Sequence, residues 1–131
     1  MTSLVCTLDI RYPIEFFSLN KPIHSARGNR LANNALKQKV KSDLYYLIKS
    51  QIKAPLLGCY HVLLDWRITS KTSDLDNLLP KLVFDSMQDN GLLINDSVKY
   101  IKRITSGFEF VKKENQGVVV KFYEAGENGT D

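Results

Sequence analysis

Two aspartates separated by a single residue, Asp74 and Asp76, are the first candidates for chemistry in this chain. They follow a run that alternates like a β-strand and precede an apolar segment with helical spacing. In an extended segment, residues two apart point to the same side, so both carboxylates can meet one cation. Oxygen ligands of this kind suit Mg²⁺, or Mn²⁺ in its place. Asp96 follows the helical segment, and we expect it to be the third ligand.

A carboxylate cluster of this kind suits metal-assisted cleavage of a phosphodiester. The ion polarises the phosphoryl oxygen, helps to generate hydroxide and offsets the developing charge. A structural interpretation stays open, because Asp74-Leu-Asp-Asn can also cap the next helix and interact with its dipole. An EF-hand calcium loop is excluded, because Leu78 and Leu79 stand where an oxygen ligand and a glycine are required.

Basic side chains are concentrated in the first half of the chain. The net charge is +4, yet the segment from Lys21 to Lys53 holds eight basic residues and one acid, Asp43. A second basic group comprises Lys99, Lys102, Arg103, Lys112 and Lys113. Such patches attract polyanions, although ordinary solvated surfaces remain the alternative.

Sequence periodicity predicts the elements that must position these residues. The expected strands lie at 4–10, at 60–68, at about 98–110 and at 117–124, and the first expected helix lies at about 31–52. Residues 12–28 are expected to form a long loop. The second helix should begin at Asp76 or Asn77 and end at Asn90-Gly91; with Asn77 as the cap, Pro80 falls at its third position.

This order of elements predicts one α/β (α+β) domain over residues 1–124, a mixed β-sheet covered by two main helices. The last two strands are expected to pair with each other, and residues 125–131 to form a disordered tail. Trp66 is expected in the core, and His61 in a hydrogen-bonded structural role.

The run Asp74-Leu-Asp-Asn-Leu-Leu-Pro-Lys-Leu-Val-Phe-Asp-Ser-Met, followed by Gly91-Leu-Leu-Ile-Asn-Asp-Ser, resembles the RusA family of Holliday junction resolvases. Members of that family show an Asp-x-Asp-Asn-Leu segment, a nearby lysine, an apolar helix, and then a glycine and an acidic pair. The segment Phe17-Ser-Leu-Asn-Lys is similar to the family's N-terminal Ser-x-Asn loop. The resemblance covers most of residues 16–100.

The resemblance implies a RusA-like fold and a homodimeric, Mg²⁺-dependent endonuclease that cuts four-way DNA junctions symmetrically in recombination and repair. Asp74, Asp76 and Asp96 match the metal-binding aspartates. Lys81 matches the catalytic lysine, which would steady charge on the scissile phosphate; an ion pair with Asp85 is its alternative role. The residues expected to contact DNA are Asn20, Lys21, His24, Arg27, Arg30 and Lys71.

Three positions depart from the family pattern. The interval from Asp76 to Lys81 is one residue longer, with Pro80 as the extra residue. Asn95 stands where an acid often precedes the last ligand, and Ser97 where a glutamine is frequent. The longer interval and Asn95 keep open a structure-selective DNA-binding protein that has lost catalysis. A nuclease of other branched DNA is a further alternative.

The sequence also predicts the cellular setting. No apolar run reaches the roughly 18 residues of a membrane helix, and the first residues lack a signal-peptide pattern. Cys6 and Cys59 are expected to be free, buried thiols. We therefore expect a cytoplasmic protein with no membrane partner and no organic cofactor.

Overall fold

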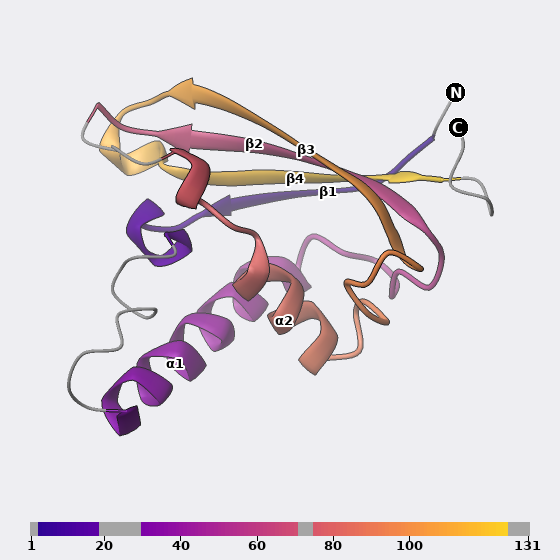
Figure 1. Cartoon of the computed structure of the whole chain (residues 1–131), viewed down its shortest axis with the longest axis horizontal. Helices are drawn as coiled ribbons and strands as arrows, with labels where there is room; N and C mark the ends of the chain where they lie inside the picture. Colours follow the sequence, from indigo (N-terminus) through magenta and orange to yellow (C-terminus); the bar gives the residue numbers. More distant parts are fainter. Residues whose placement is uncertain (1–2, 19–29, 71–74, 126–131) are drawn as a thin grey trace.

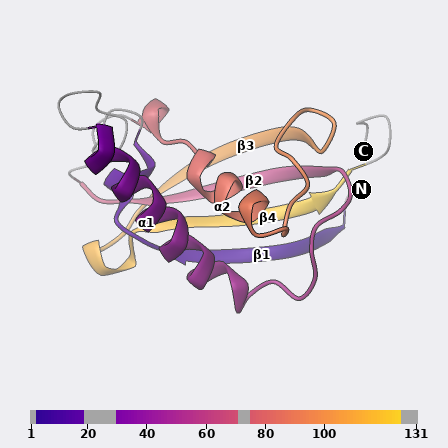
Figure 2. The same ribbon diagram turned by 90° about the horizontal axis from the view of Figure 1, so that it is seen from below.

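In a computed structural model, the chain forms a four-stranded sheet with two helices on one of its faces (Figure 1, Figure 2). The structure describes residues 3–18, 30–70 and 75–125, without the side chains of residues 30–33 and 76. Its main elements are β1 (Leu4–Arg11), α1 (Arg30–Lys49), β2 (Tyr60–Ile68), α2 (Lys81–Asp89), β3 (Ile101–Phe110) and β4 (Gly117–Glu124). Its short 3-10 helices are η1 (Ile14–Phe17), η2 (Leu75–Asn77) and η3 (Lys113–Asn115). The predicted α+β class, a mixed sheet covered by two helices, is confirmed.

The strands lie in the order β1-β4-β2-β3. β4 is antiparallel to both of its neighbours, whereas β3 runs parallel to β2. The prediction that the last two strands pair is therefore wrong, because β2 lies between them. β4 can take a central position because Val118, Val119 and Val120 are buried on both faces of the sheet.

Alternation along β1 and β2 directs one row of side chains from each strand toward the helices. The row in β2 comprises Tyr60, Val62, Leu64, Trp66 and Ile68, all of them buried. β1 adds Cys6, Leu8 and Ile10, and α1 packs Val40, Leu44 and Ile48 against these rows. The predicted place of Trp66 in the core is confirmed.

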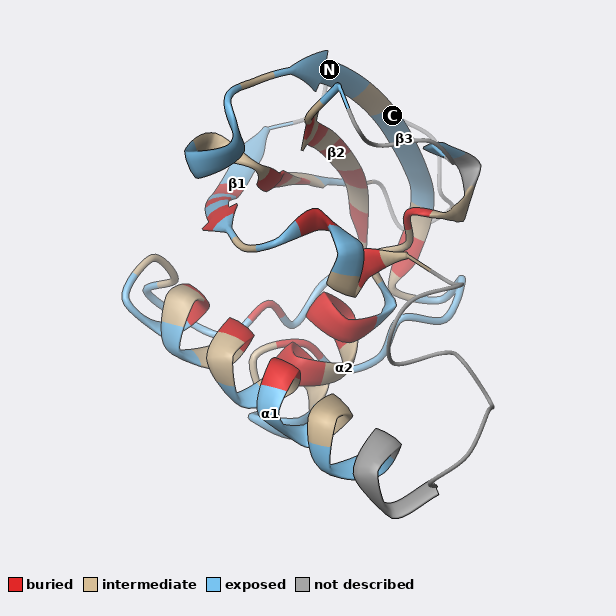
Figure 3. Ribbon diagram, turned by 90° about the vertical axis from the view of Figure 1, so that its left-hand side faces the viewer, coloured by how far each residue is buried: buried red, intermediate tan, exposed pale blue. Residues whose placement is uncertain are grey.

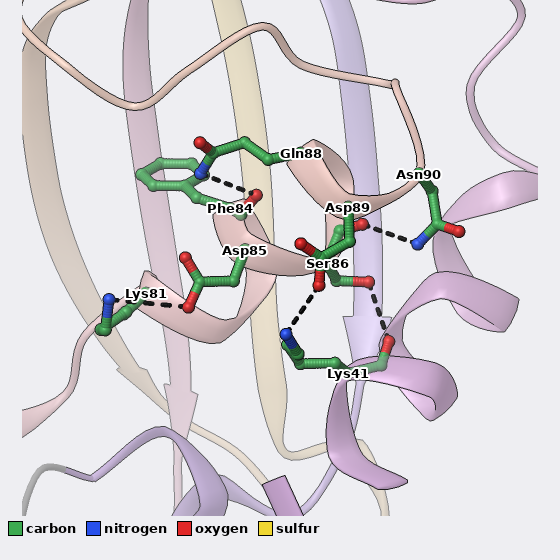
Figure 4. A network of polar contacts seen from close by, with 8 residues as sticks. All are labelled: Lys41, Lys81, Phe84, Asp85, Ser86, Gln88, Asp89 and Asn90. Carbon is green, nitrogen blue, oxygen red and sulfur yellow. Dashed lines mark hydrogen bonds and ion pairs between the residues drawn. The ribbon is translucent and has the colours of Figure 1, made fainter. Parts of the chain in front are cut away.

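Polar contacts fix α2 against α1 (Figure 4). The buried Ser86 hydroxyl donates to the backbone oxygen of Lys41 at 2.8 Å. The ammonium of Lys41 lies 2.6 Å from the Asp89 carboxylate. The Asn90 amide donates to the Ser86 backbone oxygen at 2.8 Å and closes the end of α2. The predicted helix end at Asn90-Gly91 is confirmed, and Gly91 has a φ of 72°.

The start of α2 differs from the prediction. The helix begins at Lys81 with Pro80 as its N-cap, rather than at Asp76 or Asn77. Leu78 and Leu79 pair with residues 17–18 instead of entering a helix. A tertiary contact therefore outweighs the local capping preference of Asp76 and Asn77.

The remaining expectations concern the cysteines and the chain end. Cys6 is free and buried, whereas Cys59 is free but only half-buried, at the turn before β2. The backbone N–H of Ala125 donates to the oxygen of Cys59 at 2.9 Å, and the rest of the predicted tail lies outside the described residues. Within the described ranges, no helix has the length and apolar character needed to cross a membrane.

Candidate functional site

Two motif segments that are far apart in the sequence meet near the carboxyl end of β2. The backbone N–H of Leu79 donates to the oxygen of Phe17 at 3.0 Å, and Ser18 forms an antiparallel bridge with Leu78. The Phe17 ring lies edge-on to Trp66 of β2, with 5.4 Å between ring centroids. The fold thus brings the start of the Ser-x-Asn segment beside the segment that follows Asp76.

The predicted site residues divide into those outside the described ranges and those within them. The predicted residues that lie outside the described ranges are Asn20, Lys21, His24, Arg27, Lys71 and Asp74. Asp76 lies in η2 and Arg30 begins α1, and for both only the backbone is described. Asp96 and Lys81 are described in full.

The backbone at Asp76 differs from the extended segment that the sequence predicts. The N–H of Leu78 donates to the oxygen of Leu75 at 3.2 Å, which closes a 3-10 turn over Leu75–Asn77. Such a turn has about three residues per revolution, so Leu75 and Asn77 do not share a face. The expectation of an extended chain through Asp76 is therefore wrong from Leu75 onward.

Asp96 lies toward the other end of β2. It is exposed, in the turn before β3, and the backbone N–H of Tyr60 donates to the oxygen of Tyr100 at 2.7 Å. About 20 Å of strand separates Tyr60 from Trp66, near which the η2 segment lies. Figure 1 shows this separation along β2. The structure thus places Asp96 away from the η2 backbone; because Asp74 lies outside the described residues, the shared site of the three aspartates stays a prediction.

The direction of β3 explains this separation. Because β3 runs parallel to β2, it must begin at the amino end of β2. α2 therefore carries the chain away from η2 before Asp96 is reached. Among the described residues, no group of three His, Cys, Asp or Glu side chains is arranged to hold a metal ion.

Lys81 is the first residue of α2 and projects into solvent. Its ammonium lies 3.6 Å from the carboxylate of Asp85, one helical turn along (Figure 4). This is the i,i+4 ion pair that the sequence offered as the alternative to a catalytic role. An exposed pair of this kind contributes little to stability, so Lys81 can exchange Asp85 for another anion at low cost.

Part of the predicted basic patch on α1 is neutralised within the fold. Lys39 lies 2.7 Å from Asp43, and Lys41 is paired with Asp89. The Tyr12 hydroxyl also donates to the Asp43 carboxylate at 2.7 Å. Hydrogen bonds from Lys39 and Tyr12 hold the pKa of Asp43 below its ordinary value. Burial raises the pKa of the Tyr12 hydroxyl, and the hydrogen bond to the negatively charged Asp43 raises it further.

The face of the sheet opposite the helices carries an open pocket that the sequence did not single out. It is lined by His61, Val62, Leu63, Arg103, Thr105 and Tyr123. His61 stands in register with Arg103 on one neighbouring strand and Tyr123 on the other. In the described part of the chain His61 forms no side-chain hydrogen bond, so its expected structural bond is not found. The sequence feature that could have pointed to this pocket is the second basic group, which includes Arg103.

Comparison with known proteins gives no family assignment: no family model matches the chain, and a search of curated proteins found no significant match. The likeness to the RusA family therefore rests on the motif residues themselves.

Proposed function

We propose that this chain is a Mg²⁺-dependent endonuclease of branched DNA that resolves four-way junctions as a homodimer. The observation that carries the proposal is the contact between residues 17–18 and 78–79. It joins the two segments that resemble RusA-family motifs, at one end of the sheet. The two segments are far apart in the sequence, so their contact supports a shared site.

In this proposal Asp74 and Asp76 hold the metal ion. Mg²⁺ is commonly bound through one or two carboxylates, while waters and substrate phosphates complete its shell. The chemistry of this donor pair therefore fits the ion without Asp96. When bound, the ion supplies Lewis-acid polarisation of the phosphoryl oxygen and a more acidic water. Mn²⁺ can substitute because it accepts the same oxygen ligands.

The chain's own groups position the substrate. Lys81 would leave Asp85 for an oxygen of the scissile phosphate and offset its charge. The amino end of α2 adds unpaired backbone N–H groups of the same electrostatic sign. The phosphates on either side of the scissile one would be bound by the predicted DNA-binding residues Asn20, Lys21, His24, Arg27, Arg30 and Lys71. Lys39 and Lys41 are already paired with acids, so they contribute less.

A structure-selective DNA-binding protein without catalysis is the second candidate. Two observations favour it: Asp96 is distant from η2, and Lys81 is paired with Asp85. Binding through phosphate contacts would survive both features, whereas cleavage that needs all three aspartates in one subunit would not.

The deciding experiment is cleavage of an end-labelled four-way junction in Mg²⁺ by the wild-type chain, Asp76→Asn and Asp96→Asn. We expect paired symmetric nicks from the wild type and a loss of about 100-fold or more for Asp76→Asn. Asp96→Asn is the matched control, and we expect it to cut within a few-fold of the wild type. A linear duplex, a flap and a replication fork serve as comparison substrates.

Each outcome separates the candidates. Junction binding without nicks in Mg²⁺ or Mn²⁺ would favour the DNA-binding protein. Equal rates on all branched substrates would favour a general branched-DNA nuclease. Full activity of Asp76→Asn would contradict the proposed metal site, and an inactive Asp96→Asn would contradict the two-carboxylate assignment.

A further inference from the structure

β3 differs from the other strands because Ile101 is its only buried residue (Figure 3). Ile104, Phe108 and Phe110 are 47%, 44% and 76% exposed. In the register with β2 they stand opposite Val62, Trp66 and Ile68, all of which are buried. The apolar layer on the helix side of the sheet therefore continues onto β3, beyond the cover that the helices provide.

In the described part of the chain, the outer edge of β3 also has backbone groups with no partner strand. The N–H of Val111 donates to the oxygen of Ile68 at 2.8 Å, so the peptide groups of Val111 face β2. Peptide groups alternate in direction along a strand, and the pairing is regular from Ile104 to Phe110. The N–H and C=O groups of Ile104, Ser106 and Phe108 consequently point away from β2. No strand within the described ranges pairs with this edge.

We propose that β3 pairs antiparallel with β3 of a second copy of this chain, about a two-fold axis at Ser106. The two sheets would then form one continuous sheet of eight strands. This register places Ile104 of each copy opposite Phe108 of the other. It satisfies the outward peptide groups and covers part of the exposed apolar row on β3.

The charged residues of β3 favour the register centred on Ser106 over the neighbouring registers. Centring on Ser106 places Arg103 of each copy opposite Glu109 of the other, which forms two ion pairs across the axis. Arg103 has no ion pair in the described part of the chain, and Glu109 has only a long contact of 3.9 Å with Arg67. A shift of the axis by one residue moves the strands by two and removes both charge pairs. Opposite charges across an antiparallel pair favour association, whereas like charges oppose it.

This pairing gives the two-fold dimer of the proposed function a specific surface, but it does not depend on nuclease chemistry. Its tests measure assembly alone, with no cleavage step. A failure of pairing and a failure of catalysis can therefore be told apart.

The first test is charge reversal, followed by sedimentation equilibrium of the full chain. We expect Arg103→Glu and Glu109→Arg each to weaken self-association about 10-fold or more, since each places like charges across the axis. The double variant should restore association. Lys113→Glu, an equal charge reversal on η3 away from the edge, should leave it unchanged. A monomeric wild type, or a double variant no better than the single ones, would overturn the proposal.

The second test is cross-linking at the axis. A hydrogen-bonded antiparallel pair has Cα atoms about 5.5 Å apart, which lies within the range that a disulfide spans. In a Cys59→Ser background, Ser106→Cys should form covalent dimers on mild oxidation. Thr7→Cys, on the exposed face of the other edge strand, should remain uncoupled. Equal yields from the two variants, or none from Ser106→Cys, would contradict pairing at β3.

Discussion

The two edge strands of the sheet, β1 and β3, are treated differently by the rest of the chain. Cys6, Leu8 and Ile10 of β1 are buried, and the chain that follows α1 blocks the strand's outer edge. The N–H of Asp9 donates to the side-chain oxygen of Gln51 at 2.7 Å, and the Gln51 amide donates back to the Asp9 oxygen at 2.9 Å. One side-chain amide thus pairs with a peptide of β1 as a neighbouring strand would.

β3 has neither a buried inward row nor a blocked outer edge in the described part of the chain. Its inward-facing Ile104 and Phe108 are about half exposed, and its outward peptide groups have no partner strand in the described part of the chain. Exposed edges readily pair with other strands, and proteins usually block those that are not used. One edge of the sheet is therefore closed within the subunit, whereas the other is exposed in the described part of the chain.

The largest expected effect tests the burial difference with one residue type on both edges. Ile10 on β1 is 1% exposed, whereas Ile104 on β3 is 47% exposed. Ile10→Ala should lower the free energy of unfolding by about 2–5 kcal/mol because it leaves a cavity. Ile104→Ala should cost less than about 1 kcal/mol in the monomer. Urea unfolding at low protein concentration measures both free energies. Equal losses in the two variants would contradict the difference in burial between the two edge strands.

An intermediate effect is expected from opening the blocked edge. Gln51→Ala removes both hydrogen bonds to Asp9 and should lower the free energy of unfolding by about 1 kcal/mol. Amide hydrogen exchange at Asp9 should become faster, because its N–H loses its partner. Lys53→Ala, on the nearby surface, serves as the control and should change neither quantity. Unchanged exchange at Asp9 would show that Gln51 does not protect this edge.

The smallest effect concerns pH and the hydrogen bond between Tyr12, directly after β1, and Asp43 of α1. Asp43 accepts hydrogen bonds from Lys39 and Tyr12, which lower its folded-state pKa below the unfolded value. A lowered carboxylate pKa stabilises the fold at pH values above the unfolded pKa of about 4. That contribution is lost as the pH falls through the folded-state pKa. Unfolding of wild type and Asp43→Asn between roughly pH 7 and pH 2 should converge at the acid end. A constant difference across this range would contradict the assignment.

Local patterns in the sequence were enough to predict most of the elements. The strands at 60–68 and 117–124 were predicted with the bounds that the structure gives, and the first helix with nearly the same bounds. Alternation and helical spacing are properties of a short segment, so they need no knowledge of the partners. The start of α2 was missed, because a bridge between Ser18 and Leu78 takes residues that would otherwise begin the helix.

The sequence also identified the two segments that meet in the candidate site, because their residue types and spacing are local. It could not decide which carboxylates share that site. The parallel pairing of β3 with β2 moves Asp96 toward the opposite end of the sheet. Strand order, the exposed edge of β3 and the block by Gln51 likewise depend on contacts between distant residues. Those contacts are decided by packing of the whole chain, and only the tertiary structure shows them.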